Sequence, residues 1–222
     1  MAEEAKTGYN YVEMANLFTE VSNIATQTKR IVSKYLNDDL IDPMSKLWYA
    51  PEAREFFKKF QAVVREAEEE MDGAFQGFID SLYKAQKAWS VKTKGGETAE
   101  SITIRTEKIF LYIAKFKDQR EGNIYIDEKG ALTFVEGLNT IQQKLTNELM
   151  DQKADLTSAA LAFVGNNQAE GIQKCFDKVV SSISDIFDFL TKGDTSLKSE
   201  IIRVTNEYRS FALRIKAEME EK

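Results

Sequence analysis

One unusually regular seam of apolar side chains constrains the fold of this chain more than any other feature. Its members recur at alternating spacings of three and four residues, and they are Phe57, Phe60, Val64, Ala67, Met71, Ala74 and Phe78. This is the coiled-coil spacing of a helix that packs along its neighbours at a shallow angle. A helix over 51–92 would be about 60 Å long at 1.5 Å per residue, so it needs a partner of similar length.

Similar seams predict further long helices over 9–35, 132–164, 171–192 and 195–215. Another helix is predicted over 98–118, where the apolar positions are Ile102, Ile109, Ile113 and Phe116. The composition agrees, because only two prolines and 11 glycines occur among 222 residues, and both residue types disfavour helix interiors. The sequence therefore predicts an all-α fold.

Turn signals divide the helices into pairs. The first helix should stop at 37–39 (Asn-Asp-Asp), and Pro43 and Pro51 each suit the first position of a following helix. Gly95-Gly96 is the clearest break in the chain. We expect a first hairpin over 1–94, a linker, helix and small insertion over 95–130, and a second hairpin over 131–222. The two antiparallel hairpins should pack as one elongated helical bundle.

Glycines predict a close contact within the longest helix and the end of a later one. Gly73 and Gly77 lie inside the longest predicted helix, where each costs about 1 kcal/mol relative to alanine. A close helix crossing explains them better than a bend. Gly193 predicts the end of one helix, with Asp194 or Thr195 as the N-cap of the next.

The segment 122–130 (GNIYIDEKG) differs from the rest, since Ile124 and Ile126 alternate with polar residues ahead of a turn composition. We expect a short β-hairpin near 123–129. Ile124, Tyr125 and Ile126 could pair with the exposed strand of a partner, or the hairpin could pack on its own bundle.

The chain contains no histidine, which removes Ser-His-Asp and Cys-His catalysis and the usual zinc sites. The acidic run over 66–72 spreads around a helix and is interpreted as a solvated face. Cys175 precedes the seam residue Phe176 and should behave as a small buried hydrophobe. The sequence therefore predicts no catalytic, metal or cofactor-binding residue, and no enzyme.

Charge and hydropathy limit the kinds of partner that the chain could bind and the cellular locations that it could have. A formal net charge of -6 disfavours binding to nucleic acid, which requires neutralised phosphates. Lys115, Lys117 and Arg120 are interpreted as a solvated helix end rather than an anionic-surface contact. No run approaches the roughly 18 apolar residues of a membrane span, and the acidic N-terminus is unlike a classical signal peptide. The chain should be cytoplasmic, exported by a signal-peptide-independent route, or part of a virion or other particle.

The turn before the longest helix has a second, degraded copy later in the chain. The aligned pairs are Trp48 with Phe163, Ala50 with Gly165, Ala53 with Ala169, and Phe60 with Phe176, with a one-residue gap between the turns. Pro51 starts the helix in the first copy. We expect the two aromatic side chains to fill the core rather than to act as exposed recognition anchors.

These turns resemble the signature of the WXG family, the ESAT-like helical hairpins that type VII systems secrete. In that family a Trp, any residue and a Gly connect two antiparallel helices, and an Ala follows. Trp48 with Ala53 carries one part of the motif, and Gly165 carries another. The resemblance implies hairpins that pair into four-helix bundles, so two in one chain would be a fused pair.

Secreted members of this family commonly carry a C-terminal Tyr with an acidic residue four positions later. Tyr208 is followed at that spacing by Ala212, so this sequence lacks that signal. We expect a non-enzymatic interaction or structural protein that binds a second copy or a helical partner. The alternative is a repeated structural subunit of a phage virion, tail or injection-type assembly.

Overall fold

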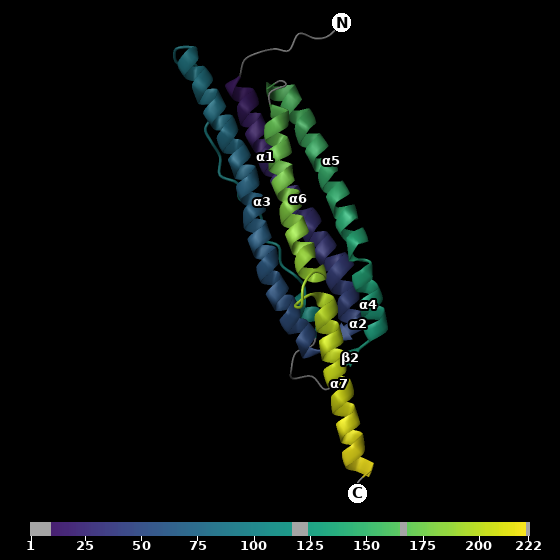
Figure 1. The fold of residues 1–222 in the computed structure, drawn as a ribbon. Helices are drawn as coiled ribbons and strands as arrows, with labels where there is room; N and C mark the ends of the chain where they lie inside the picture. The colour runs from purple at the N-terminus through teal and green to yellow at the C-terminus, as the bar shows by residue number, and fades with distance from the viewer. Residues whose placement is uncertain (1–9, 117–123, 165–167, 221–222) are drawn as a thin grey trace. The chain divides into compact units, whose positions relative to one another are not determined.

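The computed structural model describes residues 10–116, 124–164 and 168–220, and most of these are helical (Figure 1). The long helices are α1 (Tyr11–Lys34), α3 (Pro51–Lys92), α5 (Leu138–Val164), α6 (Ala169–Thr191) and α7 (Leu197–Glu220). The short ones are the π-helix η1 (Tyr35–Ile41), α2 (Asp42–Leu47), the 3-10 turn η2 (Ile113–Lys115) and α4 (Glu128–Glu136). The strands β1 (Trp48–Tyr49) and β2 (Tyr125–Ile126) form a two-stranded sheet. The all-α prediction is confirmed.

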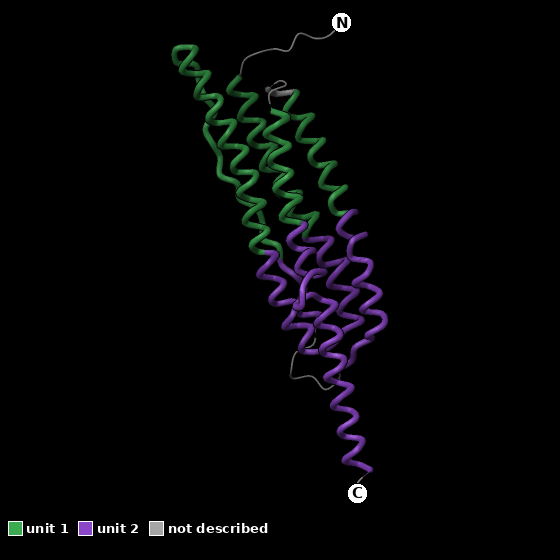
Figure 2. The backbone as a smooth tube through the Cα atoms, viewed as in Figure 1, with its two compact units in different colours: residues 1–32, 65–109, 144–183 green, residues 33–64, 110–143, 184–222 purple. Residues whose placement is uncertain are grey.

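The chain divides into two compact units, coloured separately in Figure 2. Unit 1 comprises 1–32, 65–109 and 144–183, and unit 2 comprises 33–64, 110–143 and 184–222. Each unit therefore combines segments from all three regions of the sequence, 1–94, 95–130 and 131–222.

Unit 1 is built from stretches of four long helices. In Figure 1, α1 and α6 run in one direction and α3 and α5 run in the other. The core of unit 1 contains Leu17, Phe18, Val21, Met71, Phe75, Leu149, Leu156, Phe176 and Val179. The rings of Phe75 and Phe176 meet edge to face with centroids 5.8 Å apart, and this contact joins α3 to α6.

Among the described glycines of unit 1, the close helix approach is at Gly171 and not at the glycines of α3. A Cβ atom placed on Gly171 would lie 2.8 Å from Cε2 of Phe78. A Cβ on Gly73 or Gly77 would meet nothing within 4 Å. The prediction of a close crossing at Gly73 and Gly77 is therefore wrong, because both face open space on the exposed side of α3.

Unit 2 has an aromatic core. Phe57 stacks on Phe116 with ring centroids 4.5 Å apart, and Phe60 stacks on Phe189 at 5.8 Å. The first half of α7 adds Leu197, Ile201 and Val204 to the buried residues of unit 2. Aromatic pairs of this kind contribute beyond the area that they bury.

The helix predicted over 98–118 is wrong. Residues 97–112, here called the strap, belong to no helix or strand, and within the described part of the predicted range the helical residues are those of η2. Ile102, Ile104 and Thr106 are half-buried, whereas Thr103 and Arg105 are exposed. This period of two is the alternation of a strand. The last two residues of the predicted helix, 117 and 118, lie outside the described residues.

The predicted helix end at 37–39 is also wrong, because the chain passes from α1 through η1 into α2 without leaving a helical path. Nδ2 of Asn37 donates to the carbonyl of Ser33, four residues earlier, at 2.9 Å. The N-cap of α7 is Ser196 rather than Asp194 or Thr195, since its Oγ accepts from the amide of Ser199. Gly193 has φ 83°, which agrees with a glycine at the end of α6.

The segment near 123–129 forms one strand and not a hairpin of its own. β2 pairs antiparallel with β1, so that Ile126 lies opposite Trp48 and Tyr125 lies opposite Tyr49. Residue 123 lies outside the described residues. Asp127 ends the strand and caps α4, because its Oδ1 accepts from the amide of Gly130 at 2.9 Å.

Candidate functional site: an interaction surface on helix α7

The first turn motif lies in the core of unit 2. The side chains of Trp48, Ala50 and Ala53 are fully buried, and Pro51 is the first residue of α3. The Trp48 ring lies 6.4 Å from that of Phe56. Its indole Nε1 is buried and has no hydrogen-bond partner in the described part of the chain. Trp48 can therefore pack but cannot contact a partner from this position.

The second turn motif has different surroundings. Phe163 belongs to the last turn of α5, and its side chain and Gly165 lie outside the described residues. Ala169 is the first residue of α6 and is exposed, whereas Ala53, its counterpart in the first copy, is buried. The two copies therefore differ in environment at this position.

The predicted contact residues lie on β2 or just before it, where Ile124 and Tyr125 are exposed and Ile126 is half-buried. The ring of Tyr125 stacks on that of Tyr49 with centroids 5.8 Å apart, and Ile126 is half-buried opposite Trp48. Ile124 is 51% exposed. It lines an open groove of about 990 Å³ together with α7 side chains that include Tyr208, Phe211 and Arg214.

Helix α7 carries more exposed large apolar side chains than any other helix or strand described in unit 2. Its buried stripe includes Ile201 and Val204 and ends at Tyr208, whose hydroxyl donates to Oε2 of Glu52 at 2.7 Å. From 209 to 220 every residue is exposed. Figure 1 shows this yellow half of α7 running on past the other helices of its unit.

The exposed half continues the same apolar stripe. Phe211, Ile215 and Met219 follow Val204 and Tyr208 at helical spacings of three and four, and they are 56%, 39% and 75% exposed. These three residues form what we call the outer face of α7. The seam predicted from the sequence is thus packed as far as Tyr208 and has no partner among the described residues beyond it. An exposed apolar stripe of this kind is a candidate docking surface.

Charged groups beside the outer face differ in how they are paired. Arg203 bridges Glu200 and Glu207, and its hydrogen bonds lower the pKa of the Glu200 carboxyl. Arg209 pairs with Glu128. Arg214 lies over the Phe211 ring at 5.4 Å. Within the described residues, neither Arg214 nor Glu218 has an ion-pair partner.

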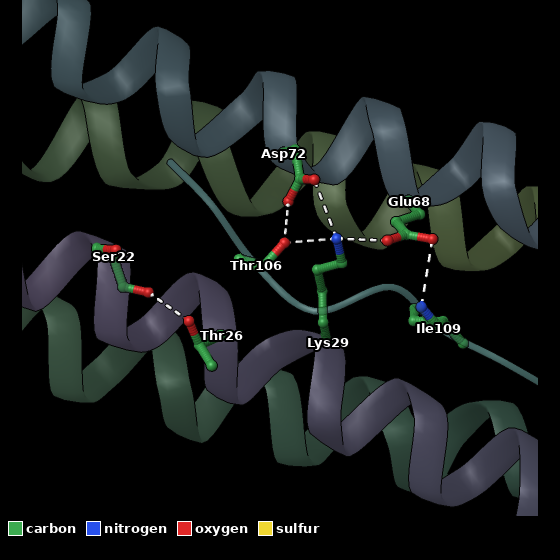
Figure 3. A network of polar contacts seen from close by, with 7 residues as sticks. All are labelled: Ser22, Thr26, Lys29, Glu68, Asp72, Thr106 and Ile109. Atoms are coloured by element: carbon green, nitrogen blue, oxygen red, sulfur yellow. Dashed lines mark hydrogen bonds and ion pairs between the residues drawn. The ribbon is translucent and has the colours of Figure 1, made fainter. Parts of the chain in front are cut away.

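A separate polar cluster fixes the strap in unit 1 (Figure 3). Nζ of the buried Lys29 lies 2.7 Å from Oε1 of Glu68 and 2.9 Å from Oδ2 of Asp72. It also donates to Oγ1 of Thr106 on the strap, which in turn donates to Oδ1 of Asp72 at 2.8 Å. Each of these side chains contacts another member of the cluster. The cluster therefore holds α1, α3 and the strap together.

Side-chain amides bind the main chain of the strap. In unit 1, Gln86 donates to the carbonyl of Ala99 and accepts from its amide, and Gln76 accepts from the amide of Ile104 at 2.8 Å. In unit 2, Asn37 likewise accepts from the amide of Tyr112. These bonds take the place of a neighbouring strand. Sequence reasoning missed these residues, although the alternation over 102–106 was a visible signal for them.

Cys175 is the remaining side chain that could be considered for catalysis. Burial raises the pKa of the Cys175 thiol to about 12, so this thiol is not an activated nucleophile. Among the described residues no group of three or more Cys, Asp or Glu side chains is arranged to hold a metal ion. No described helix is both long and apolar enough to cross a membrane.

Comparison with protein-family models, curated proteins and solved structures gives no match for this chain.

Proposed function

We propose that this chain is a non-enzymatic protein–protein interaction protein and that the outer face of α7 is its binding element. The observation that carries the proposal is the uncovered stripe of Phe211, Ile215 and Met219. It continues the packed stripe of the same helix at steps of three and four residues. Nothing in the local sequence requires this half of the helix to be apolar unless another chain covers it.

The energetics favour this reading. Full burial of a large apolar side chain contributes about 1.5–3 kcal/mol, and the outer face offers three such side chains. The neighbouring groove adds Ile124 and Tyr208. An aromatic and aliphatic centre beside arginines is the composition that protein interfaces favour.

The sequence leaves two kinds of interaction protein open. The first is an ESAT-like interaction protein that resembles the hairpins of type VII secretion. The second is a repeated structural subunit of a phage or injection-type particle. The first should purify as a discrete monomer or dimer, whereas the second should form rings, tubes or larger oligomers. The free face of α7 is compatible with both forms.

Two matched double variants test the proposal. Phe211→Glu with Ile215→Glu places two acidic side chains on the outer face. Leu213→Glu with Ala217→Glu makes the same charge change on the opposite side of the same exposed helix. Light scattering with negative-stain microscopy should show that only the first variant loses its assemblies. Formation of the same dimers or larger assemblies by all three proteins would contradict the proposal.

A further inference from the structure

We propose that the partner of the outer face is a second copy of this chain, and that two α7 helices pair antiparallel about a two-fold axis beside Ile215. This rests on the proposed function and names its partner. A two-fold interface brings one surface patch against itself, so that patch must be complementary to itself. The outer face of α7 meets this condition in the placement of its apolar and its charged residues.

The apolar residues are symmetric about Ile215. Phe211 lies four residues before it and Met219 four residues after it, or about 6 Å along the axis in each direction. Antiparallel pairing therefore places Phe211 against the partner's Met219, twice in the dimer. Ile215 meets the partner's Ile215 at the centre. Sulfur–aromatic contacts and a central aliphatic pair are favourable in such a seam.

The charges of Arg214 and Glu218 follow the same symmetry. At about 100° per residue, Arg214 and Glu218 lie on the same flank of the stripe. Arg214 is one residue before Ile215 and Glu218 is three residues after it. In the antiparallel pair the partner's Glu218 is then displaced from Arg214 by about 3 Å along the axis. Two ion pairs would form between groups that have no such partner among the described residues.

Parallel pairing does not produce this match. The partner's Glu218 would then be four residues, or about 6 Å, further along the axis from Arg214. Phe211 would face the partner's Phe211, and Met219 would face the partner's Met219. The opposite flank does not decide the direction, because Lys216 already has Glu220 as its neighbour at 3.6 Å.

Charge exchange provides the first test. Arg214→Glu alone and Glu218→Arg alone each place like charges against each other in the homodimer. Sedimentation equilibrium should show about tenfold weaker self-association for each variant. An equimolar mixture should recover association as a heterodimer, because both ion pairs then form, one in the native sense and one with its two charges exchanged. Both positions are exposed, so circular dichroism should show no change. A mixture no tighter than either variant alone would overturn the proposed pairing.

Cysteine crosslinking provides the second test and fixes the direction. Ile215→Cys should form a symmetric disulfide, and Leu213→Cys, on the far side of the helix, should not. Phe211→Cys mixed with Met219→Cys should form a disulfide between the two chains, while Phe211→Cys alone should not. Crosslinking by Phe211→Cys alone would show a parallel pair and overturn the antiparallel arrangement. A wild-type chain that stays monomeric at all concentrations would overturn self-pairing, yet covalent capture of a different protein from position 211 would leave the proposed function standing.

Discussion

Tyr208 on α7 donates a hydrogen bond to Glu52 in the first turn of α3, with 2.7 Å between Oη and Oε2. This contact is where the packed part of α7 ends, because all described residues after it are exposed. One hydroxyl thus separates the half of the helix that belongs to the core of unit 2 from the half that is free for a partner.

Replacing Tyr208 by Phe should lower the free energy of unfolding by about 0.5–1.5 kcal/mol, the usual net value of one hydrogen bond. Burial, followed by the bond to Glu52, raises the pKa of Tyr208 above its ordinary 10.0. Its contribution is therefore complete below pH 10 and is lost as the pH rises beyond that value. Urea titrations at a series of pH values should show that the difference in free energy of unfolding between wild type and variant becomes smaller above pH 10. A gap that is independent of pH would contradict this account of the hydroxyl.

Replacing Trp48 by Ala should lower the free energy of unfolding by about 3–5 kcal/mol, because a fully buried ring leaves a cavity in unit 2. Trp89→Ala is the matched control, since Trp89 is only half-buried near the end of α3. Chemical denaturation followed by circular dichroism measures both. Equal losses for the two variants would argue against Trp48 as a core side chain.

The glycines should respond with opposite signs. Gly73→Ala and Gly77→Ala should each stabilise the protein by about 0.5–1 kcal/mol, because alanine favours the helix and its methyl group meets open space. Gly171→Ala should destabilise it by about 1–3 kcal/mol, since the new methyl group would press on the Phe78 ring. Melting temperatures of the three variants provide the comparison. Destabilisation by Gly73→Ala would indicate that another helix approaches that face.

Gln76→Leu should loosen the strap without unfolding unit 1. The variant removes the acceptor of the Ile104 amide and the donor to the Ile102 carbonyl. Hydrogen exchange at the Ile104 amide should accelerate by about tenfold, corresponding to one lost hydrogen bond. Lys84→Leu, which places the same side chain at an exposed position of α3 in unit 1, is the control. Unchanged exchange at Ile104 in the Gln76 variant would show that the side-chain amide does not hold the strap.

The long helices were predictable because their apolar residues recur at helical spacing and most of the same residues are buried in the structure. The stripe from Phe57 to Phe78 forms the buried side of α3, as its three–four spacing predicts. The strap was not predicted, because Ile102, Ile109, Ile113 and Phe116 also fit helical spacing over a short window. Ile102, Ile104 and Thr106 also fit the two-residue period of a strand. The structure follows this second pattern, because Gln76 and Lys29 form hydrogen bonds with the strap.

The candidate site was only half visible in the sequence. The seam on α7 predicts that Phe211 and Ile215 are packed, but periodicity does not tell which part of a seam finds its partner within the same chain. That answer depends on where the other helices end. Lys29 was missed for a related reason, because a buried lysine becomes intelligible only when Glu68 and Asp72 are brought beside it.

Photo-crosslinking from the outer face of α7 tests the central claim most directly. A photoreactive phenylalanine analogue is placed at position 211 or, as control, at position 213, in cells that produce the protein; Phe211 is 56% and Leu213 69% exposed. The account predicts covalent adducts to another polypeptide from position 211, identified by mass spectrometry, and few or none from position 213. Equal labelling from both positions, or no adduct from position 211, would show that this face is not an interaction surface.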